Sequence, residues 1–322
     1  MLKEIIFSIL RRLNIVNKLD SQKDFGIKVV CFHSVSDKND YAYPSMPVKT
    51  FENIIKYFSQ NYSVILPNDI GKTTPKPKLI ITFDDGYKDF IINALPILVK
   101  YKIPAIMHVV VNTVLTGENF WTQKIAQAVD KSLETGKILK LNTPEFDKSY
   151  SVTKNNAEKI ALEIFNKLMR MNKDERNAII NHLYEDSKEM QNIPMMNFDD
   201  LKTCLKNNIT IGSHSYTHEN MALDLDKEVI HTELIESKLK LEEILNTKIE
   251  CFAFPNGLKN EKLIDILIEA GYKYVFTTED IMYTPQPKAK INIIPRIILF
   301  GNSVDENILR TSLFHSRVKK LF

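Results

Sequence analysis

The stretch KLIITFDDGY, residues 78–87, joins a short apolar run directly to two acids and a glycine. The run KLIITF has the length and the β-branched content of a buried strand. Such a strand normally ends in a single turn-forming residue, whereas Asp84 and Asp85 stand here ahead of Gly86. Two interpretations are open at this point: a polar turn, or a pair of carboxylates placed for catalysis.

The composition describes a globular chain with a large core. With 322 residues, 44% of them hydrophobic, it can form one large α/β domain or two smaller ones. A net charge of +3 is too small to indicate nucleic-acid binding. The three cysteines are far apart and predict buried, reduced thiols rather than a disulfide framework. No apolar stretch approaches the length of a membrane span.

Strand-like and helical segments alternate on both sides of the opening stretch. The expected strands are 27–32, 62–66, 78–83, 104–111, 209–212, 251–254, 272–278 and 293–300. The expected helices are 50–60, 88–101, 197–207, 225–245 and 259–270. This alternation favours an α/β fold, a (β/α) barrel of about seven strands with its active site at the C-terminal ends of the strands.

Three segments interrupt or flank the barrel, which is expected over 23–303. From about 118 to 200 the strand signal vanishes, which predicts a helical insertion rather than a second domain with its own sheet. Residues 1–22 pattern as an amphipathic helix that lacks the features of a secretory signal. Residues 304–322 form a basic C-terminal helix in this interpretation. Two alternatives remain for the end helices: packing on the domain, or peripheral contact with an anionic membrane surface.

The stretch GSHSYTHEN, residues 212–220, carries two histidines just after an expected strand. A spacing of four residues aims the imidazoles of His214 and His218 at one point. Two histidines alone are weak evidence, but the Asp84–Asp85 pair offers a third ligand at another strand end. A catalytic zinc-type site needs three protein ligands and an open position. The other aspartate is then free to take a proton from a water molecule.

The motifs TFDDGY, SHSYTH and FAFPNG, in this order, resemble those of the polysaccharide deacetylases of carbohydrate esterase family 4. The resemblance extends over about residues 27–300. It implies a distorted (β/α) barrel and metal-dependent removal of acetyl groups from N-acetylated sugars. It also implies that Asp84 is the general base and that Asp85, His214 and His218 hold the metal. Zn²⁺ is the expected ion, with Co²⁺ or Ni²⁺ as alternatives.

Further site residues are expected around these motifs. The backbone N–H of Asn256 is placed to hold the developing oxyanion, in a loop fixed by Pro255 and Gly257. Tyr87 and Pro255 are expected to contact the substrate. Trp121, the only tryptophan, either stacks on a sugar face or packs in the core.

The sequence departs from the family pattern at two places. The family has an arginine two residues before the proline of its third motif, where this chain has Ala253. Arg296 either replaces it from a neighbouring strand or is an ordinary arginine at a sheet edge.

The family's late Leu-x-His, whose histidine protonates the leaving amine, has no match, because residues 299–301 read Leu-Phe-Gly. His33 in CFHSV is the expected general acid, because the first and last strands adjoin in a closed barrel; one branch of the family has a similar N-terminal histidine motif. A merely structural role for His33 is the alternative. His108, inside an apolar strand, is expected to be a satisfied core histidine.

The favoured function is a metal-dependent hydrolase that removes an N-acetyl group from a sugar. A lipid-linked or nucleotide-linked precursor of a surface glycan is the expected substrate, and the expected location is the cytoplasm or a membrane surface. One alternative is a deformylase acting on a lipid-linked amino sugar. Another is a catalytically silent family member that binds glycan, which the missing arginine and late histidine favour. A nucleotide-binding enzyme is set aside, because no phosphate-binding glycine motif occurs.

Overall fold

The computed structural model describes residues 26–38, 40–144, 146–185, 192–223, 225–286 and 288–313. The amphipathic helix expected at 1–22 lies outside these ranges. The described part of the basic C-terminal segment, residues 304–313, contains helix α13 (Val304–Thr311), which packs against α3 (Val48–Asn61). Within the described residues, no helix is long and apolar enough to cross a membrane.

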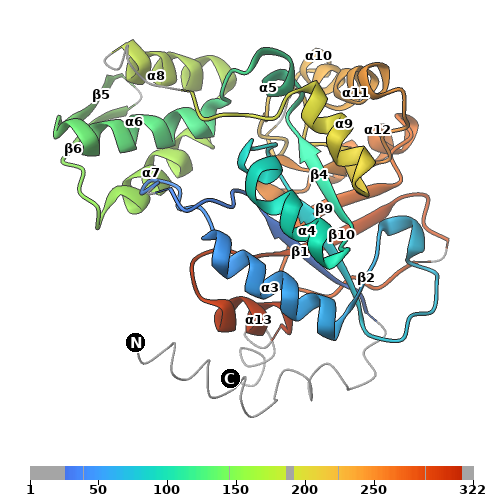
Figure 1. Cartoon of the computed structure of the whole chain (residues 1–322). Coiled ribbons are helices and arrows are strands. Elements are labelled where there is room, and N and C mark those ends of the chain that lie inside the picture. The colour runs from blue at the N-terminus through green and yellow to red at the C-terminus, as the bar shows by residue number, and fades with distance from the viewer. Residues whose placement is uncertain are drawn as a thin grey trace, which may run out of the picture.

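Seven parallel strands of the described chain close into a barrel (Figure 1). Strand β1 pairs on one side with β10 and on the other with β3, and this second pairing completes the ring. The predicted distorted (β/α) barrel is confirmed. The ring consists, in order, of β1 (Lys28–Phe32), β10 (Asn292–Ile298), β9 (Tyr274–Thr278), β8 (Cys251–Ala253), β7 (Ile209–Ser213), β4 (Ala105–Val109) and β3 (Lys78–Phe83). The short strand β2 (Ser63–Val64) pairs with the start of β3, outside the ring.

The strands are buried on both faces, which explains their nearly continuous apolar sequences. Helix α3 shows the complementary pattern, because Phe51, Ile54, Ile55 and Phe58 recur at helical spacing and are buried. The other elements around the barrel are η1 (Pro67–Asp69), η2 (Phe90–Ala94), α4 (Leu95–Tyr101), α5 (Val111–Thr116), α9 (Phe198–Lys206), α10 (Lys227–Ile230), η3 (His231–Glu236), α11 (Ser237–Leu245), η4 (Pro255–Gly257), η5 (Glu261–Leu263) and α12 (Ile264–Glu269).

The insertion stands beside the barrel and has its own apolar cluster (Figure 1). It contains α6 (Trp121–Thr135), β5 (Leu139–Thr143), β6 (Phe146–Tyr150), α7 (Ala157–Leu168) and α8 (Lys173–Glu185). Strands β5 and β6 pair as an antiparallel hairpin, which the sequence did not predict within this otherwise helical insertion. The hairpin buries Leu139 and Leu141 and exposes Lys140 between them, a short alternation that composition obscured.

Candidate metal centre

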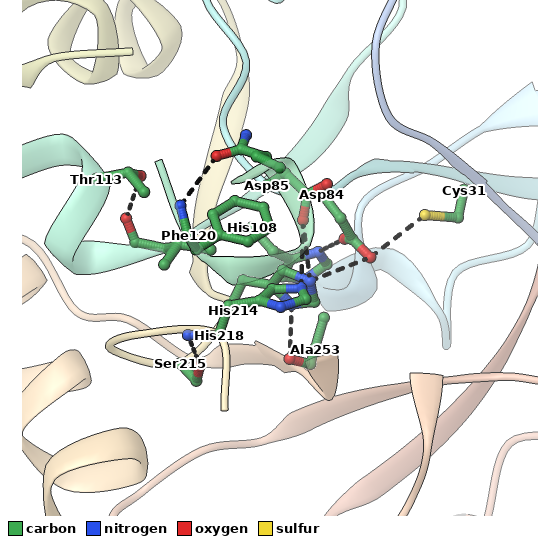
Figure 2. Close-up of polar contacts among 12 residues, drawn as sticks. Cys31, Asp84, Asp85, His108, Thr113, Phe120, His214, Ser215, His218 and Ala253 are labelled. Atoms are coloured by element: carbon green, nitrogen blue, oxygen red, sulfur yellow. Dashed lines mark hydrogen bonds and ion pairs between the residues drawn. The ribbon is translucent and has the colours of Figure 1, made fainter. Parts of the chain in front are cut away.

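The two aspartates occupy a sharp turn at the end of β3. The backbone N–H of Asp84 still donates to the carbonyl oxygen of Phe32 at 3.1 Å, as if the strand continued. Asp85 then adopts φ of 75° and Gly86 φ of 83°. Glycine adopts this left-handed region freely, and aspartate is among the few other residues that do so routinely. The turn brings both carboxylates into one buried cluster with three histidines (Figure 2).

Asp85 faces the two histidines of the second motif. Its Oδ1 atom lies 3.4 Å from Nε2 of His214 and 3.6 Å from Nε2 of His218. All three side chains are buried. Two ligand atoms that are each about 2.1 Å from a tetrahedral ion lie about 3.4 Å from one another. The separations within this group therefore fit one shared divalent cation.

The surroundings of the imidazoles agree with that interpretation. Nδ1 of His214 lies 2.9 Å from the carbonyl oxygen of Ala253, so we assign the ring hydrogen to Nδ1 and the lone pair to Nε2. Burial lowers the pKa of His218 to about 3, which keeps this imidazole neutral. Burial also acts to lower the pKa of His214, but Asp84 and Asp85 raise it above its usual value. The negative charge of the two carboxylates thus favours a cation at this point.

Asp84 has a different set of partners. Its carboxylate accepts two hydrogen bonds from Arg296, both at 2.7 Å, and lies 2.9 Å from Nδ1 of His108. The Cys31 thiol approaches its other side at 3.4 Å. Burial alone would raise the pKa of Asp84, but Arg296, His214 and His108 hold it well below the usual value. The two neighbouring acids are therefore separated into one that faces the histidine pair and one that is held ionised by an arginine.

Arg296 projects from β10 into the barrel and is 1% exposed. The alternative of an ordinary sheet-edge arginine was therefore wrong. Besides Asp84, the guanidinium donates to the Thr277 carbonyl oxygen and to Thr82 Oγ1, each at 3.2 Å. Its contact with Asp84 is the one that the arginine missing at position 253 was expected to make.

His108 was assigned to the core from sequence, and the structure corrects this. The ring is buried, but it contacts Asp84, and its Nε2 has no hydrogen-bond partner within the described structure. His108 stands in register with Gly212, where an added Cβ would lie 2.4 Å from the imidazole Cδ2. The sequence signal for this close packing is a histidine within one strand, His108, paired with a glycine near the end of the neighbouring strand, Gly212.

His33 and Tyr43 lie on the segment that follows β1. Ligand atoms of His33, Cys31 and Asp84 lie within 4.8 Å of one another, so His33 stands beside the expected base. The Tyr43 ring lies 6.1 Å from the His33 ring and is 46% exposed. Desolvation and the charges of Asp85 and Asp84 raise the pKa of Tyr43 above its usual value. Sequence reasoning did not find Tyr43, because no motif marks this segment.

The family model of polysaccharide deacetylases matches residues 71–275, well over half of the chain. The chain belongs to the polysaccharide deacetylase family. The "Putative polysaccharide deacetylase YxkH" of Bacillus subtilis (strain 168) is 30% identical over 94 residues. That alignment covers 27% of this chain and spans only 33% of the length of the relative.

Solved structures share the fold of this deacetylase-family chain. The deacetylase PplD of Streptococcus pyogenes, solved in complex with acetate, superposes with a TM-score of 0.60 at 17% identity, covering 89% of this chain and 98% of PplD. IcaB from Ammonifex degensii gives a TM-score of 0.58 at 17% identity, covering 89% of this chain and 97% of IcaB.

The third deacetylase motif lies directly beside the histidines. Ala253, whose carbonyl oxygen contacts His214, is followed by the short helix η4 (Pro255–Gly257). Asn256 adopts φ of 60°, and its buried Nδ2 has no hydrogen-bond partner in the described part of the chain. Gly257 has φ of 70°, and an added Cβ would lie 2.0 Å from Thr278 Oγ1. The loop is therefore closely fixed, and the oxyanion role of the Asn256 N–H stays a prediction.

The two aromatic residues expected to contact the substrate are mostly buried. Trp121 is 6% exposed, stacks on the Phe165 ring at 5.4 Å and lies 4.8 Å from the Arg176 guanidinium. This indole leaves no open face for a sugar, so the packing alternative replaces the stacking one. Tyr87 is also 6% exposed, and its contact with the substrate stays a prediction, as does that of the buried Pro255.

Proposed function

We propose that this protein is a metal-dependent hydrolase that removes an N-acetyl group from a sugar. The observation that carries the proposal is that two adjacent acids have different partners. Asp85 faces His214 and His218, whereas Asp84 is bound by Arg296. Family membership supports the same reaction class, as do the names of the relatives.

Asp85, His214 and His218 are the residues that would hold the ion. One carboxylate and two imidazoles form a donor set that suits Zn²⁺ best, with Co²⁺ and Ni²⁺ as alternatives. When bound, the ion supplies Lewis-acid chemistry, acidifying a water molecule and polarising the amide carbonyl.

The other residues of the site move protons and stabilise charge. Asp84, kept ionised by Arg296, accepts a proton from the attacking water. The backbone N–H of Asn256 donates to the oxygen that becomes negatively charged. His33, which lies beside Asp84, donates a proton to the leaving nitrogen, so that the amine departs neutral. Tyr43, which is half-exposed and lies beside the His33 ring, is placed to meet the sugar.

The substrate assignment has two levels. An N-acetylated sugar or glycan follows from the reaction class of the family. A lipid-linked or nucleotide-linked precursor of a surface glycan is the finer proposal, and it rests on the sequence alone.

Metal stoichiometry combined with acetate release tests the proposal. The parent protein should bind about one Zn²⁺ per chain and release acetate from a panel of N-acetylated amino sugars. Asp85→Asn and His214→Ala should lose the ion. His231→Ala, at an exposed histidine of η3 that belongs to none of the three motifs, is the matched control and should keep it.

Asp84→Asn separates the base from the ligands. It should keep the zinc and lose acetate release by about 10²- to 10⁴-fold, the usual contribution of general base catalysis. A parent protein that takes up no Zn²⁺, Co²⁺ or Ni²⁺ after supplementation would contradict the metal centre. A parent that binds zinc and glycan but releases no acetate would contradict the hydrolase and favour a binding protein.

A further inference from the structure

Three consecutive residues at the end of the stretch 212–220 are each held by a different part of the insertion. The first is His218, whose carbonyl oxygen accepts a hydrogen bond from Trp121 Nε1 at 2.9 Å. The ring of Phe120 stacks on the His218 imidazole, with centroids 4.3 Å apart and planes at 21°. Both aromatic residues stand at the start of α6. The first residues of the insertion therefore contact His218 at its ring and at its backbone.

The next two residues contact the other two helices of the insertion. Glu219 accepts two hydrogen bonds from the guanidinium of Arg176 in α8, at 2.7 and 2.6 Å, and both residues are 2% exposed. Asn220 donates from Nδ2 to the carbonyl oxygen of Met169, which follows α7, at 2.9 Å. The Arg176 guanidinium also lies over the Trp121 ring, so the contacts to His218 and Glu219 form one connected group.

His218 needs such support more than His214 does. The Nδ1 of His214 bonds to Ala253, whereas the buried Nδ1 of His218 has no hydrogen-bond partner in the described structure. His218 also has φ of 64° and Ser215 has φ of 67°, a left-handed conformation that β-carbon-bearing residues adopt at a cost of roughly 1–2 kcal/mol each. Such a conformation persists only where its surroundings impose it.

We propose that the insertion sets the metal affinity of the site, with Trp121 and Arg176 acting as positioning residues for His218. The proposal rests on the metal centre proposed above and assigns the insertion a role that the three motifs do not require. Without these contacts the 214–220 segment would populate relaxed backbone conformations in which Nε2 of His218 turns away from Asp85. Each such conformation would lower the fraction of chains competent to bind the ion.

Trp121→Phe tests the indole, because it removes the N–H and keeps an aromatic ring between the same neighbours. We expect the dissociation constant for Zn²⁺ to rise about 3- to 10-fold, the effect of one neutral hydrogen bond. Arg176→Met combined with Glu219→Gln removes the ion pair without leaving a buried charge unpaired. For this double variant we expect the dissociation constant for Zn²⁺ to rise about 10-fold or more, as it does when other residues that orient metal ligands are changed.

Leu141→Ala is the matched control. Leu141 belongs to the buried cluster of the same insertion and takes no part in the bonds to residues 218–220. It should lower the unfolding midpoint of the metal-free protein and leave the zinc dissociation constant unchanged. Variants at Trp121 and Arg176 that lose stability like this control, yet bind zinc as tightly as the parent, would overturn the proposal.

Amide hydrogen exchange of the metal-free protein gives a second readout that requires no ion. Exchange in the 214–220 segment should be faster in Trp121→Phe than in the parent and unchanged in Leu141→Ala. A parent that binds no zinc would refute the metal centre, while the exchange rates would still decide whether the insertion holds this segment. Equal exchange in the parent and in Trp121→Phe would refute the positioning role alone.

Discussion

The Asp84–Arg296 pair gives the sharpest test of how this site is built. Arg296→Met leaves a buried carboxylate, and Asp84→Asn leaves a buried guanidinium. Removing one member of a buried ion pair typically costs about 3–5 kcal/mol of unfolding free energy. We expect the low end, about 3 kcal/mol, in both cases. Asp84 keeps its contacts with His108 and Cys31, and Arg296 keeps two acceptors on Thr82 and Thr277.

The double variant should be far less destabilised than the sum of the two single variants. With both charges removed, no unpaired ion remains, so the double variant should lose no more than about 3 kcal/mol. The two single variants sum to about 6 kcal/mol, so the coupling should be at least about 3 kcal/mol. Urea unfolding of the metal-free parent, the two single variants and the double variant at pH 7 measures this coupling free energy. The partly exposed pair of Arg310 and Asp280, 3.8 Å apart, is the control and should give less than about 1 kcal/mol. Additive losses at the buried pair would refute the reasoning.

The same pair determines a pH dependence. The folded-state pKa of Asp84 is depressed, so its contribution to stability is present above the unfolded value of about 3.9 and is lost as the pH falls through the folded value. In Arg296→Met, burial is no longer opposed by the guanidinium and the pKa should rise. Acidification towards pH 4 should then restore stability to this variant relative to the parent.

Three further predictions concern the surroundings of the site. His33→Gln should lower acetate release by about 10²-fold or more and leave zinc binding intact; an unchanged rate would remove His33 as the general acid. Burial raises the pKa of Asp89 to about 6, so its contribution to stability is present below about pH 4 and is lost as the pH rises through 6. Asp89→Asn should therefore gain on the order of 2 kcal/mol relative to the parent between pH 4 and 7, and parallel stability curves would contradict this. Gly257→Ala should be clearly more destabilising in thermal unfolding than Gly301→Ala. Both glycines have positive φ, but only at Gly257 would the new Cβ meet Thr278; equal losses would show that the contact relaxes.

The predicted ligand group was accessible from sequence because its members stand at strand ends. Asp85 follows β3, and His214 and His218 follow β7, so the parallel order of the sheet brings them to one edge. Arg296 was weighed as a partner of the base because a neighbouring strand could bring it there. Its contact with Asp84 depends on β10 closing the ring, which local sequence does not encode.

The parts that escaped prediction lack such local signals. His108 lies inside β4, where the surrounding apolar run is typical of a core strand whether or not the imidazole faces the site. Tyr43 reaches the site through the path of an irregular segment, which periodicity does not describe. The β5–β6 hairpin was missed because lysine, aspartate and serine occupy its exposed positions, and its buried residues are few.

The closure of the barrel has a consequence for how the protein is made. Asp84 and Arg296 are separated by 212 positions in the chain. Strand β1 can complete its pairing only after β10 has been synthesised. Synthesis proceeds from the N-terminus, and contacts between such distant residues form late in folding. A nascent chain that stops before β10 would carry a buried acid without its arginine and two open strand edges, which invite aggregation. The Asp84–Arg296 contact can therefore form only after nearly all of the described barrel has been synthesised.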